Sequence, residues 1–189
     1  EQCFAVMGAS EHHCIFGGDS CFIVHPSDTA PALAALDARL TISGPSGSRT
    51  VPVSSFFVLP RANARKENIL VPGEIVTAVL LDAPKAGMRS KYRKVRERAS
   101  FDFALVGAAV ALTLAGGRVN FARVVLSGVA PAPWRVPETE KALMGNPLDA
   151  ETVGSASAAA VKEATALPKN EYKIAMTRGV LEETLLSLA

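Results

Sequence analysis

A run of basic residues between two apolar segments constrains this chain more than any other feature. Residues 74–81 form an apolar, strand-like segment, and residues 103–115 form a second apolar segment. Between them stand six cationic side chains within ten residues: Arg89, Lys91, Arg93, Lys94, Arg96 and Arg98. Because a buried charge is costly, such a run must face water or an anionic or electron-rich ligand. The run therefore indicates either a solvated sheet face or a binding site.

Length and charge exclude several classes of protein. The chain has 189 residues, enough for one large domain or two small ones, and a formal net charge of +2. A net charge near zero argues against a dedicated nucleic-acid-binding protein, because phosphate affinity depends on a cationic surface. No apolar run reaches the ~18 residues of a membrane span. No signal peptide opens the chain, so we expect a cytoplasmic protein, with export alongside partners left open.

The first part of the chain is predicted to mix strands with one helix. Asp28 is expected to cap that helix, with Pro31 in its first turn, where proline is tolerated. Gly and Pro bound the short β-prone segments on either side. The expected elements are a strand at 21–25, a helix at 29–38, a hairpin of 39–42 and 49–53, and a strand at 74–81.

The second part is predicted to be a three-stranded antiparallel meander followed by three helices. Residues 82–87 form the best domain boundary, since they combine Pro and Gly. The expected strands are 89–96, 102–114 and 119–127, and the expected helices are 139–144, 150–165 and 172–188. In the last helix an apolar stripe recurs at three and four residues: Ile174, Thr177, Leu181, Leu185 and Leu188. Strands followed by helices favour the α+β class, with helices on one face of the sheet.

Three motifs, taken in order, carry a family resemblance. They are His25-Pro26-Ser27-Asp28, the basic run with Phe101-Asp102-Phe103-Ala104, and Gly128-Val129-Ala130-Pro131 with Trp134-Arg135. Together they resemble the flavoprotein subunit of the xanthine dehydrogenase, carbon-monoxide dehydrogenase and aldehyde oxidoreductase family of molybdenum hydroxylases. The resemblance implies that residues 1–83 form the second lobe of an FAD-binding domain and residues 88–189 the C-terminal domain. Because no GxGxxG or P-loop is present to hold a pyrophosphate, we expect the first lobe to be missing upstream.

Asp28 and Lys94 are the main candidate cofactor-binding residues. From the residues alone, Asp28 is a helix cap and Lys94 belongs to a solvated sheet face. The resemblance implies instead that Asp28 accepts hydrogen bonds from the ribityl side of FAD and that Lys94 approaches the isoalloxazine edge. A cation there stabilises the negative charge of the reduced ring. The position of Lys94 is counted back from residues 101–104, with a margin of one or two residues.

Further residues receive roles from the same resemblance. Ile75 and Val76 are implied to lie against the flavin or the adenine, whereas the residues alone are equally typical of a core. Residues 96–101 match a mobile loop that controls access of nicotinamide or oxygen to the flavin. His25 is interpreted as a hydrogen-bonded histidine at a strand end, and Trp134-Arg135 as structural. No catalytic side chain is predicted, because no nucleophile–base arrangement is present.

Three cysteines stand near the start of the chain. Cys3, Cys14 and Cys21 match no zinc spacing, and their odd number argues against a closed disulfide set. Some relatives carry an extra iron–sulfur cluster in this subunit, which leaves open a role for Cys3 or Cys21. A four-iron cluster normally takes four thiolates, however, so buried free thiols are preferred and no metal site is predicted.

The function predicted from the sequence is that of a flavin-dependent oxidoreductase subunit. The resemblance implies FAD as cofactor, with a molybdopterin-binding large subunit and a two-iron iron–sulfur small subunit as partners. Electrons would pass from the iron–sulfur clusters through FAD to NAD, oxygen or another acceptor, and the fragment alone is expected to be inactive. The alternative is a non-catalytic module that docks onto partner subunits without a flavin of its own. The substrate of the complex is not encoded in this chain.

Overall fold

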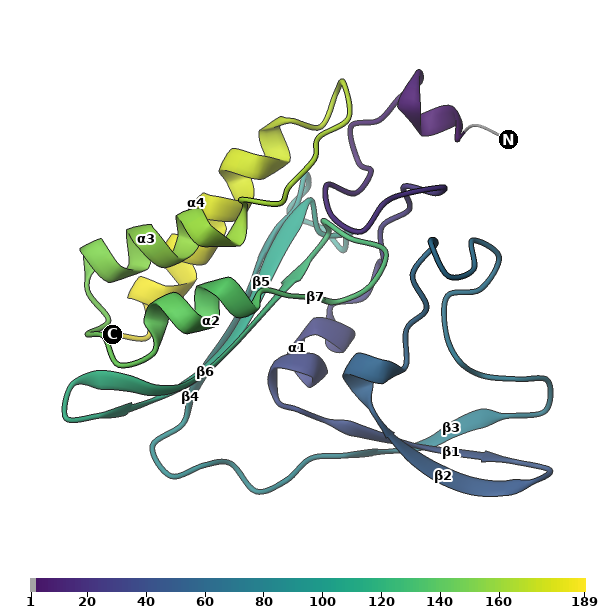
Figure 1. Cartoon of the computed structure of the whole chain (residues 1–189), viewed down its shortest axis with the longest axis horizontal. Coiled ribbons are helices and arrows are strands. Elements are labelled where there is room, and N and C mark those ends of the chain that lie inside the picture. The colour runs from purple at the N-terminus through teal and green to yellow at the C-terminus, as the bar shows by residue number, and fades with distance from the viewer. Residues whose placement is uncertain (1–2) are drawn as a thin grey trace.

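Two antiparallel sheets organise residues 3–189, the part of the chain that the computed structural model describes (Figure 1). The first sheet has the order β2-β1-β3 and the second the order β4-β5-β6-β7. The strands are β1 Arg39–Gly44, β2 Gly47–Pro52, β3 Ile75–Leu80, β4 Arg89–Val95, β5 Val106–Ala115, β6 Arg118–Ser127 and β7 Trp134–Arg135. The helices are α1 Thr29–Ala35, α2 Pro137–Leu143, α3 Ala150–Ala160 and α4 Tyr172–Leu186. The predicted α+β class is confirmed.

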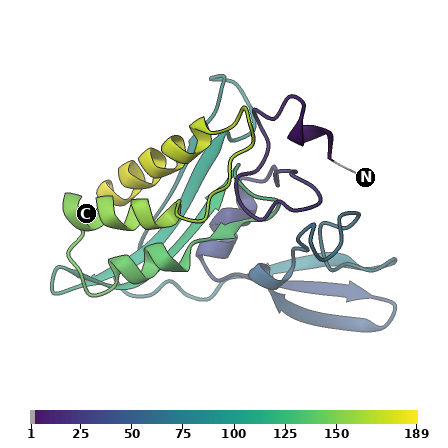
Figure 2. The same cartoon turned by 45° about the horizontal axis from the view of Figure 1, so that its top comes forward.

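Strand β5 is the centre of the larger sheet and is buried on both faces. Its side chains alternate in direction, so Val106, Val110 and Leu112 pack with the C-terminal helices while Ala109 packs with Ala35 of α1. Figures 1 and 2 show α2, α3 and α4 on one face of this sheet and α1 on the other. The expectation that the C-terminal helices cover one face is confirmed, and α1 from the first part of the chain covers the opposite face.

The predicted meander is confirmed as β4, β5 and β6, with one strand added. Residues 102–105 belong to the preceding loop, so β5 begins later than expected. The additional strand β7 has only two residues and pairs with Val125 and Leu126, too short for periodicity to reveal. Trp134 in β7 stacks on Phe16 with ring centroids 5.5 Å apart, which gives it a packing role.

The three C-terminal helices form close to where the sequence places them. In α4 the side chains of Thr177, Leu181 and Leu185 are buried against the core, as the apolar stripe predicts. Pro137 is the first residue of α2, where its missing amide has no helical partner to lose. The helix predicted at 139–144 therefore begins two residues earlier than expected.

The segment 21–25 is extended but pairs with no strand among the described residues, so the strand predicted there is wrong. Its backbone is held by loops instead: the Cys14 amide donates to the Phe22 carbonyl at 3.1 Å, and the His25 amide donates to the Ala130 carbonyl at 2.9 Å. Partners from irregular segments satisfy these backbone groups, where the prediction from β-propensity expected a sheet.

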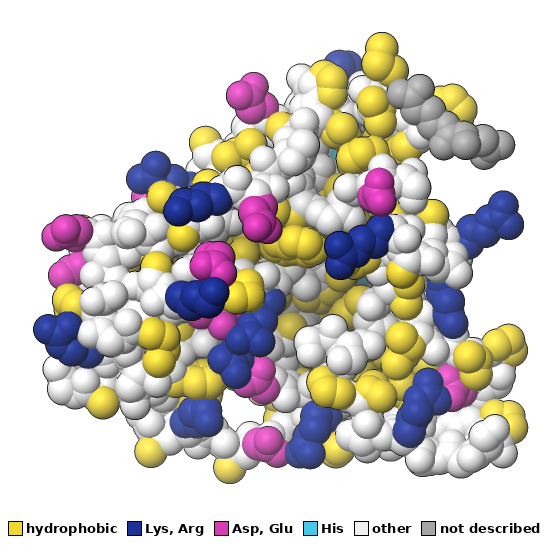
Figure 3. All heavy atoms as spheres, in the orientation of Figure 1, with side chains coloured by type: hydrophobic (Ala, Val, Ile, Leu, Met, Phe, Trp, Pro, Cys, Tyr) yellow, Lys and Arg dark blue, Asp and Glu magenta, His cyan; other side chains and the backbone are white. Residues whose placement is uncertain are grey.

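The basic strand β4 is an edge strand and pairs only with β5. The apolar segment that precedes it in sequence, β3, pairs with β1 in the other sheet. Cationic side chains are common on edge strands, because charge prevents pairing with another chain. Basic and acidic side chains are interspersed on the face shown in Figure 3. No helix within residues 3–189 has the length and apolar character to cross a membrane.

The boundary at residues 82–87 stays a prediction, and limited proteolysis tests it. These residues are exposed, and Gly87 adopts a positive φ of 69° in a turn. We expect a protease to cut there, or in the exposed loop 61–68, and to leave a resistant C-terminal fragment. Mass spectrometry of the fragments identifies the site. First cleavage inside the buried residues 106–113 would contradict both the boundary and the sheet.

Candidate functional site

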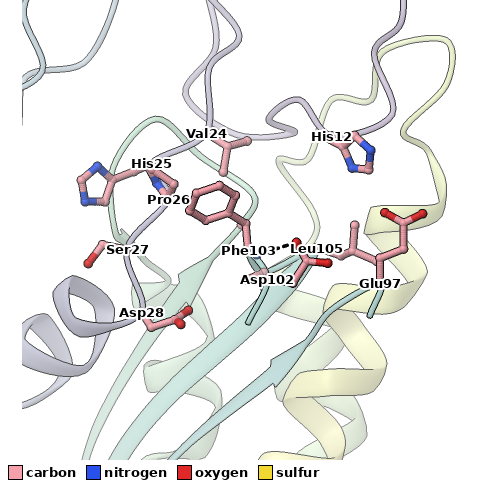
Figure 4. Close-up of a pocket in the computed structure, with 12 residues that line it drawn as sticks. His12, Val24, His25, Pro26, Ser27, Asp28, Glu97, Asp102, Phe103 and Leu105 are labelled. Carbon is pink, nitrogen blue, oxygen red and sulfur yellow. Dashed lines mark hydrogen bonds between the residues drawn. The ribbon is translucent and has the colours of Figure 1, made fainter. Parts of the chain in front are cut away.

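A cleft of ≈ 320 Å³ lies where the extended segment before α1, the loop between β4 and β5, and the turn after β6 meet (Figure 4). Apolar side chains form much of its lining, and polar groups enter from both sides. The apolar group is Val24, Pro26, Phe103, Ala104 and Leu105, and the polar group is His12, His25, Ser27, Asp28, Glu97 and Asp102. Such a lining fits a flat organic ligand with polar edges.

Asp28 lies at the start of α1, but it does not cap the helix. The Ala30 amide donates to Ser27 Oγ at 3.0 Å, so Ser27 provides the side-chain cap. Asp28 has helical backbone angles and no capping bond, which corrects the sequence interpretation. Because Ser27 takes the capping role, the Asp28 carboxylate is free to face the cleft.

Lys94 meets Asp28 at the edge of the cleft. Its Nζ lies 2.5 Å from Asp28 Oδ2 and 2.8 Å from the Asp102 carbonyl oxygen. The Lys94 side chain is 15 % exposed, so the expectation of a fully solvated sheet face is wrong for this residue. The structure thus brings together two of the predicted cofactor-binding residues, which lie on elements far apart in sequence.

Alternation along β4 explains why Lys94, and not its neighbours, contacts Asp28 and Asp102 of the cleft wall. Tyr92 and Lys94 point to the α1 face of the sheet. Arg89 and Arg93 point to the other face, where Arg89 donates to the Leu188 carbonyl and Arg93 pairs with Glu183 of α4. The basic run therefore divides between a helix contact on one face and the cleft on the other.

Tyr92 and Ser127 complete the surroundings of Asp28, and sequence reasoning missed both. The Tyr92 hydroxyl donates to Asp28 Oδ1 at 2.8 Å and lies 3.1 Å from Ser127 Oγ. Burial raises the pKa of Tyr92, so its phenol stays protonated as a donor. Gly107 makes room for this group, since a Cβ there would lie 2.4 Å from Ser127 Oγ. Tyr92 stands two residues before Lys94, and this spacing places both side chains on the same face of a strand, which was the available sequence signal for Tyr92.

His25 differs from its sequence interpretation. Its ring Nδ1 is buried, and no hydrogen-bond partner for it exists in the described part of the chain. The ring packs edge-on against Phe57 at 4.7 Å and points away from Phe103 in Figure 4. Burial lowers the pKa of His25, which keeps the ring neutral near pH 7. The predicted hydrogen-bonded histidine is therefore wrong for the side chain, although its backbone amide is bonded.

Ile75 and Val76 do not reach this cleft. They lie on β3 in the smaller sheet and are 63 % and 38 % exposed, so a simple core role is wrong for both. In the loop 96–101, Phe101 is exposed, and Arg98 pairs with Asp102 at 3.0 Å.

The three cysteines are free thiols with different surroundings. Cys14 is buried, and this burial raises its pKa to about 12, whereas Cys3 and Cys21 are partly exposed. The expectation of buried thiols thus holds for Cys14 alone. Within residues 3–189, no group of three His, Cys, Asp or Glu side chains is arranged to hold a metal ion.

Comparison with known proteins gives the family. The CO dehydrogenase flavoprotein C-terminal domain matches residues 90–188, more than half of the chain. The FAD binding domain in molybdopterin dehydrogenase matches residues 14–84. The chain belongs to this family of flavoprotein subunits. The resemblance inferred from the three sequence motifs is confirmed.

Individual relatives of the flavoprotein subunit agree with this assignment. The aldehyde oxidoreductase FAD-binding subunit PaoB of Escherichia coli is 40 % identical over 71 % of this chain and 41 % of its own length. The carbon monoxide dehydrogenase medium chain of Hydrogenophaga pseudoflava is 31 % identical over 72 % of this chain and 46 % of its own. The structure of reconstituted CO dehydrogenase from Oligotropha carboxidovorans superposes with a TM-score of 0.72 at 29 % identity, covering 85 % of this chain and 56 % of that one. The chain thus spans about half the length of its relatives.

Proposed function

We propose that the cleft holds the isoalloxazine ring of FAD and that the protein acts as the FAD-binding subunit of a molybdenum hydroxylase. The observation that carries this proposal is the meeting of Asp28 and Lys94 at the cleft, because the resemblance independently assigns both residues to the flavin. The match to an FAD-binding domain over residues 14–84 supports the same ligand.

The residues present fit a flavin ring. Lys94 has three N–H donors and uses two within the described residues, so one is available to a ligand oxygen or nitrogen. Asp28 accepts one bond at each carboxylate oxygen and keeps acceptor capacity for a ligand N–H. Phe103 and Leu105 offer apolar surface to the ring faces. A bound flavin would supply reversible electron transfer, which no amino-acid side chain here provides.

The size of the cleft limits what it holds. A volume of ≈ 320 Å³ lies at the small end of ligand pockets, which suits one ring system better than a whole dinucleotide. We propose that the rest of FAD lies outside this cleft and that the exposed Ile75 and Val76 contact it. The loop 96–101 is proposed to control access to the ring.

The place of the subunit in a complex is also a proposal. Electrons would come from a molybdopterin-binding large subunit through a two-iron iron–sulfur small subunit and leave to NAD, oxygen or another acceptor. The names of the relatives support this role, since they are FAD-binding subunits and medium chains of dehydrogenases and oxidoreductases. We expect the chain alone to be inactive, because that electron path depends on cofactors of the partners.

A flavin-binding measurement tests the proposal with a matched pair of variants. We expect purified residues 1–189 to be nearly colourless and to bind added FAD weakly, because no pyrophosphate loop is present. Lys94→Met should weaken this binding about tenfold, equivalent to about 1.4 kcal/mol. Lys91→Met should leave it unchanged, since Lys91 is exposed on the same strand. Flavin fluorescence titration measures all three proteins.

Reduction potentials extend the same comparison to the flavin-loaded subunit. Loss of the Lys94 ammonium leaves the Asp28 carboxylate unpaired, so Lys94→Met should lower the flavin potential by about 20 mV, or about 1 kcal/mol. Equal binding and equal potential in the Lys94 and Lys91 variants would refute a flavin at this cleft.

The alternative of a docking module without flavin has one observation in its favour. β3 and the residues beside it expose apolar side chains on both faces, including Val71, Val79 and Leu81. Exposed apolar surface of this kind marks an interaction site. Difference absorption spectra separate the two functions, since a bound flavin shifts the visible bands of added FAD, whereas a docking module without a flavin site leaves the spectrum of free FAD unchanged.

A further inference from the structure

Lys173 is a buried cation without an anionic partner. Its side chain is 1 % exposed, and no carboxylate within residues 3–189 forms a salt bridge with it. Its Nζ donates instead to two backbone carbonyls, those of His12 at 2.9 Å and Gly128 at 2.7 Å. The residue also lies in the first turn of α4, where the helix dipole disfavours positive charge. Burial and the helix dipole both oppose this charge, which is unusual for a residue with a purely structural role.

Both acceptor carbonyls belong to residues that line the cleft. Gly128 begins a turn in which three successive carbonyls accept bonds from different parts of the chain. Lys173 donates to Gly128, the Ile15 and Phe16 amides donate to Val129, and the His25 amide donates to Ala130. This turn therefore ties the N-terminal segment, the segment before α1 and α4 to one point behind the cleft.

We propose that Lys173 is a positioning residue of the cleft: its ammonium joins the walls at His12 and Gly128 and favours an anionic form of the bound ligand. For the identity of that ligand the inference rests on the proposed function, and the anionic form is the reduced flavin ring. Lys94 cannot supply the same field alone, because Asp28 neutralises its charge. Lys173 has no carboxylate partner within the described residues, so only the dipoles of its two carbonyl acceptors offset its charge.

The charge of Lys173 is predicted to disappear in mildly alkaline solution. Burial lowers its pKa to about 8 from the ordinary 10.5. Between these values the unfolded chain binds the proton and the folded chain does not, so the contribution of Lys173 to folding stability rises with pH. Cys14, whose pKa is raised to about 12, acts in the opposite direction above pH 9. The other ionisable groups on the surrounding segments are Glu11, His12, His13, Glu97, Lys169 and Tyr172.

The test compares Lys173→Met with Lys169→Met, a control four residues earlier whose lysine side chain is 55 % exposed. The first readout uses the chain without flavin: NMR of ¹³Cε-labelled lysine should show one residue titrating near pH 8 that Lys173→Met removes. The second readout is the affinity for oxidised FAD and for chemically reduced FAD at pH 7. Lys173→Met should weaken the binding of reduced FAD about fivefold more than the binding of oxidised FAD. Lys169→Met should change neither the ratio of these two affinities nor the lysine titration near pH 8.

The pH dependence of FAD affinity shows whether the effect of Lys173 comes from its charge or from a loss of folded structure. In the wild-type chain the preference for reduced FAD should fall between pH 7 and 9, while thermal unfolding shows no matching loss of stability. An ordinary lysine titration, or an unchanged affinity ratio in Lys173→Met, would overturn the assignment. If Lys173→Met does not fold, the wild-type titration and the pH dependence of the ratio decide it. A titration near pH 8 without any flavin binding would overturn the proposed function and the ligand assigned to Lys173, but not its buried charge.

Discussion

Gly128→Ala should be among the most damaging single substitutions in this protein. Gly128 has a φ of 74°, and an added Cβ would lie 2.7 Å from the carbonyl oxygens of both Ala104 and Leu105. These are backbone atoms that line the cleft, so they cannot move aside as a flexible side chain would. Left-handed strain and overpacking together predict a loss of about 3–4 kcal/mol in the free energy of unfolding. Urea denaturation measures it.

Gly116→Ala is the matched control for this prediction. Gly116 also has a positive φ, 57°, but nothing lies within 4 Å of an added Cβ. We therefore expect a loss of about 1 kcal/mol from backbone strain alone. Equal losses in the two variants would show that the close approach of Gly128 to the loop before β5 carries no energetic weight. If Gly128→Ala loses more free energy of unfolding than Gly116→Ala and also binds FAD more weakly, the turn at Gly128 helps to shape the cleft.

Asp28→Ala should produce the second large effect. It leaves both the Lys94 ammonium and the Tyr92 hydroxyl without their carboxylate acceptor. Asp28 is 43 % exposed, so solvent screens part of the interaction, and we expect a loss of about 2 kcal/mol in stability. FAD affinity should fall at least tenfold, or about 1.4 kcal/mol. Denaturation and flavin titration measure the two losses separately.

Two further variants assign the cause. Ser27→Ala should cost about 1 kcal/mol of stability through the lost helix cap while leaving the pair of Asp28 and Lys94 in place. In a double-mutant cycle, Asp28→Ala and Lys94→Met should be coupled by roughly 1 kcal/mol or more, because each removes the partner of the other. Independent effects of Asp28 and Lys94 would contradict the ion pair as the organising contact of the site.

The regular elements were predictable because local pattern determines them. The hairpin of β1 and β2, strand β3, the meander and the last three helices all follow apolar periodicity and Gly or Pro punctuation. The strand predicted at 21–25 was wrong, since its hydrogen-bond partners are irregular segments: Cys14 nearby and Ala130 more than a hundred residues away. The face covered by α1 was missed for the same reason: which sheet face a helix covers is a tertiary property.

The motifs drew attention to Asp28 and Lys94 but not to the residues that surround them. Asp28 and Lys94 were found through the motifs, but their mutual contact and the capping by Ser27 depend on how α1 meets β4. Tyr92 is a usual strand residue in sequence and becomes a donor to Asp28 only through the sheet register. In the sequence, Lys173 stands near the start of α4 as an apparent surface lysine. Its burial comes from the N-terminal segment, which local pattern does not place.

The alternation of cations along β4 restricts how this region tolerates changes in length. Because Arg93 pairs with Glu183 of α4 and Lys94 pairs with Asp28 on the opposite face, inserting or deleting a single residue within β4 would exchange the two side chains between faces. The ion pair with α4 and the pair with Asp28 would then be lost together. The exposed loop residues 99–101 carry no such constraint, since none of them takes part in the strand ladder. Insertions and deletions should therefore be tolerated at residues 99–101 of the loop but not within β4.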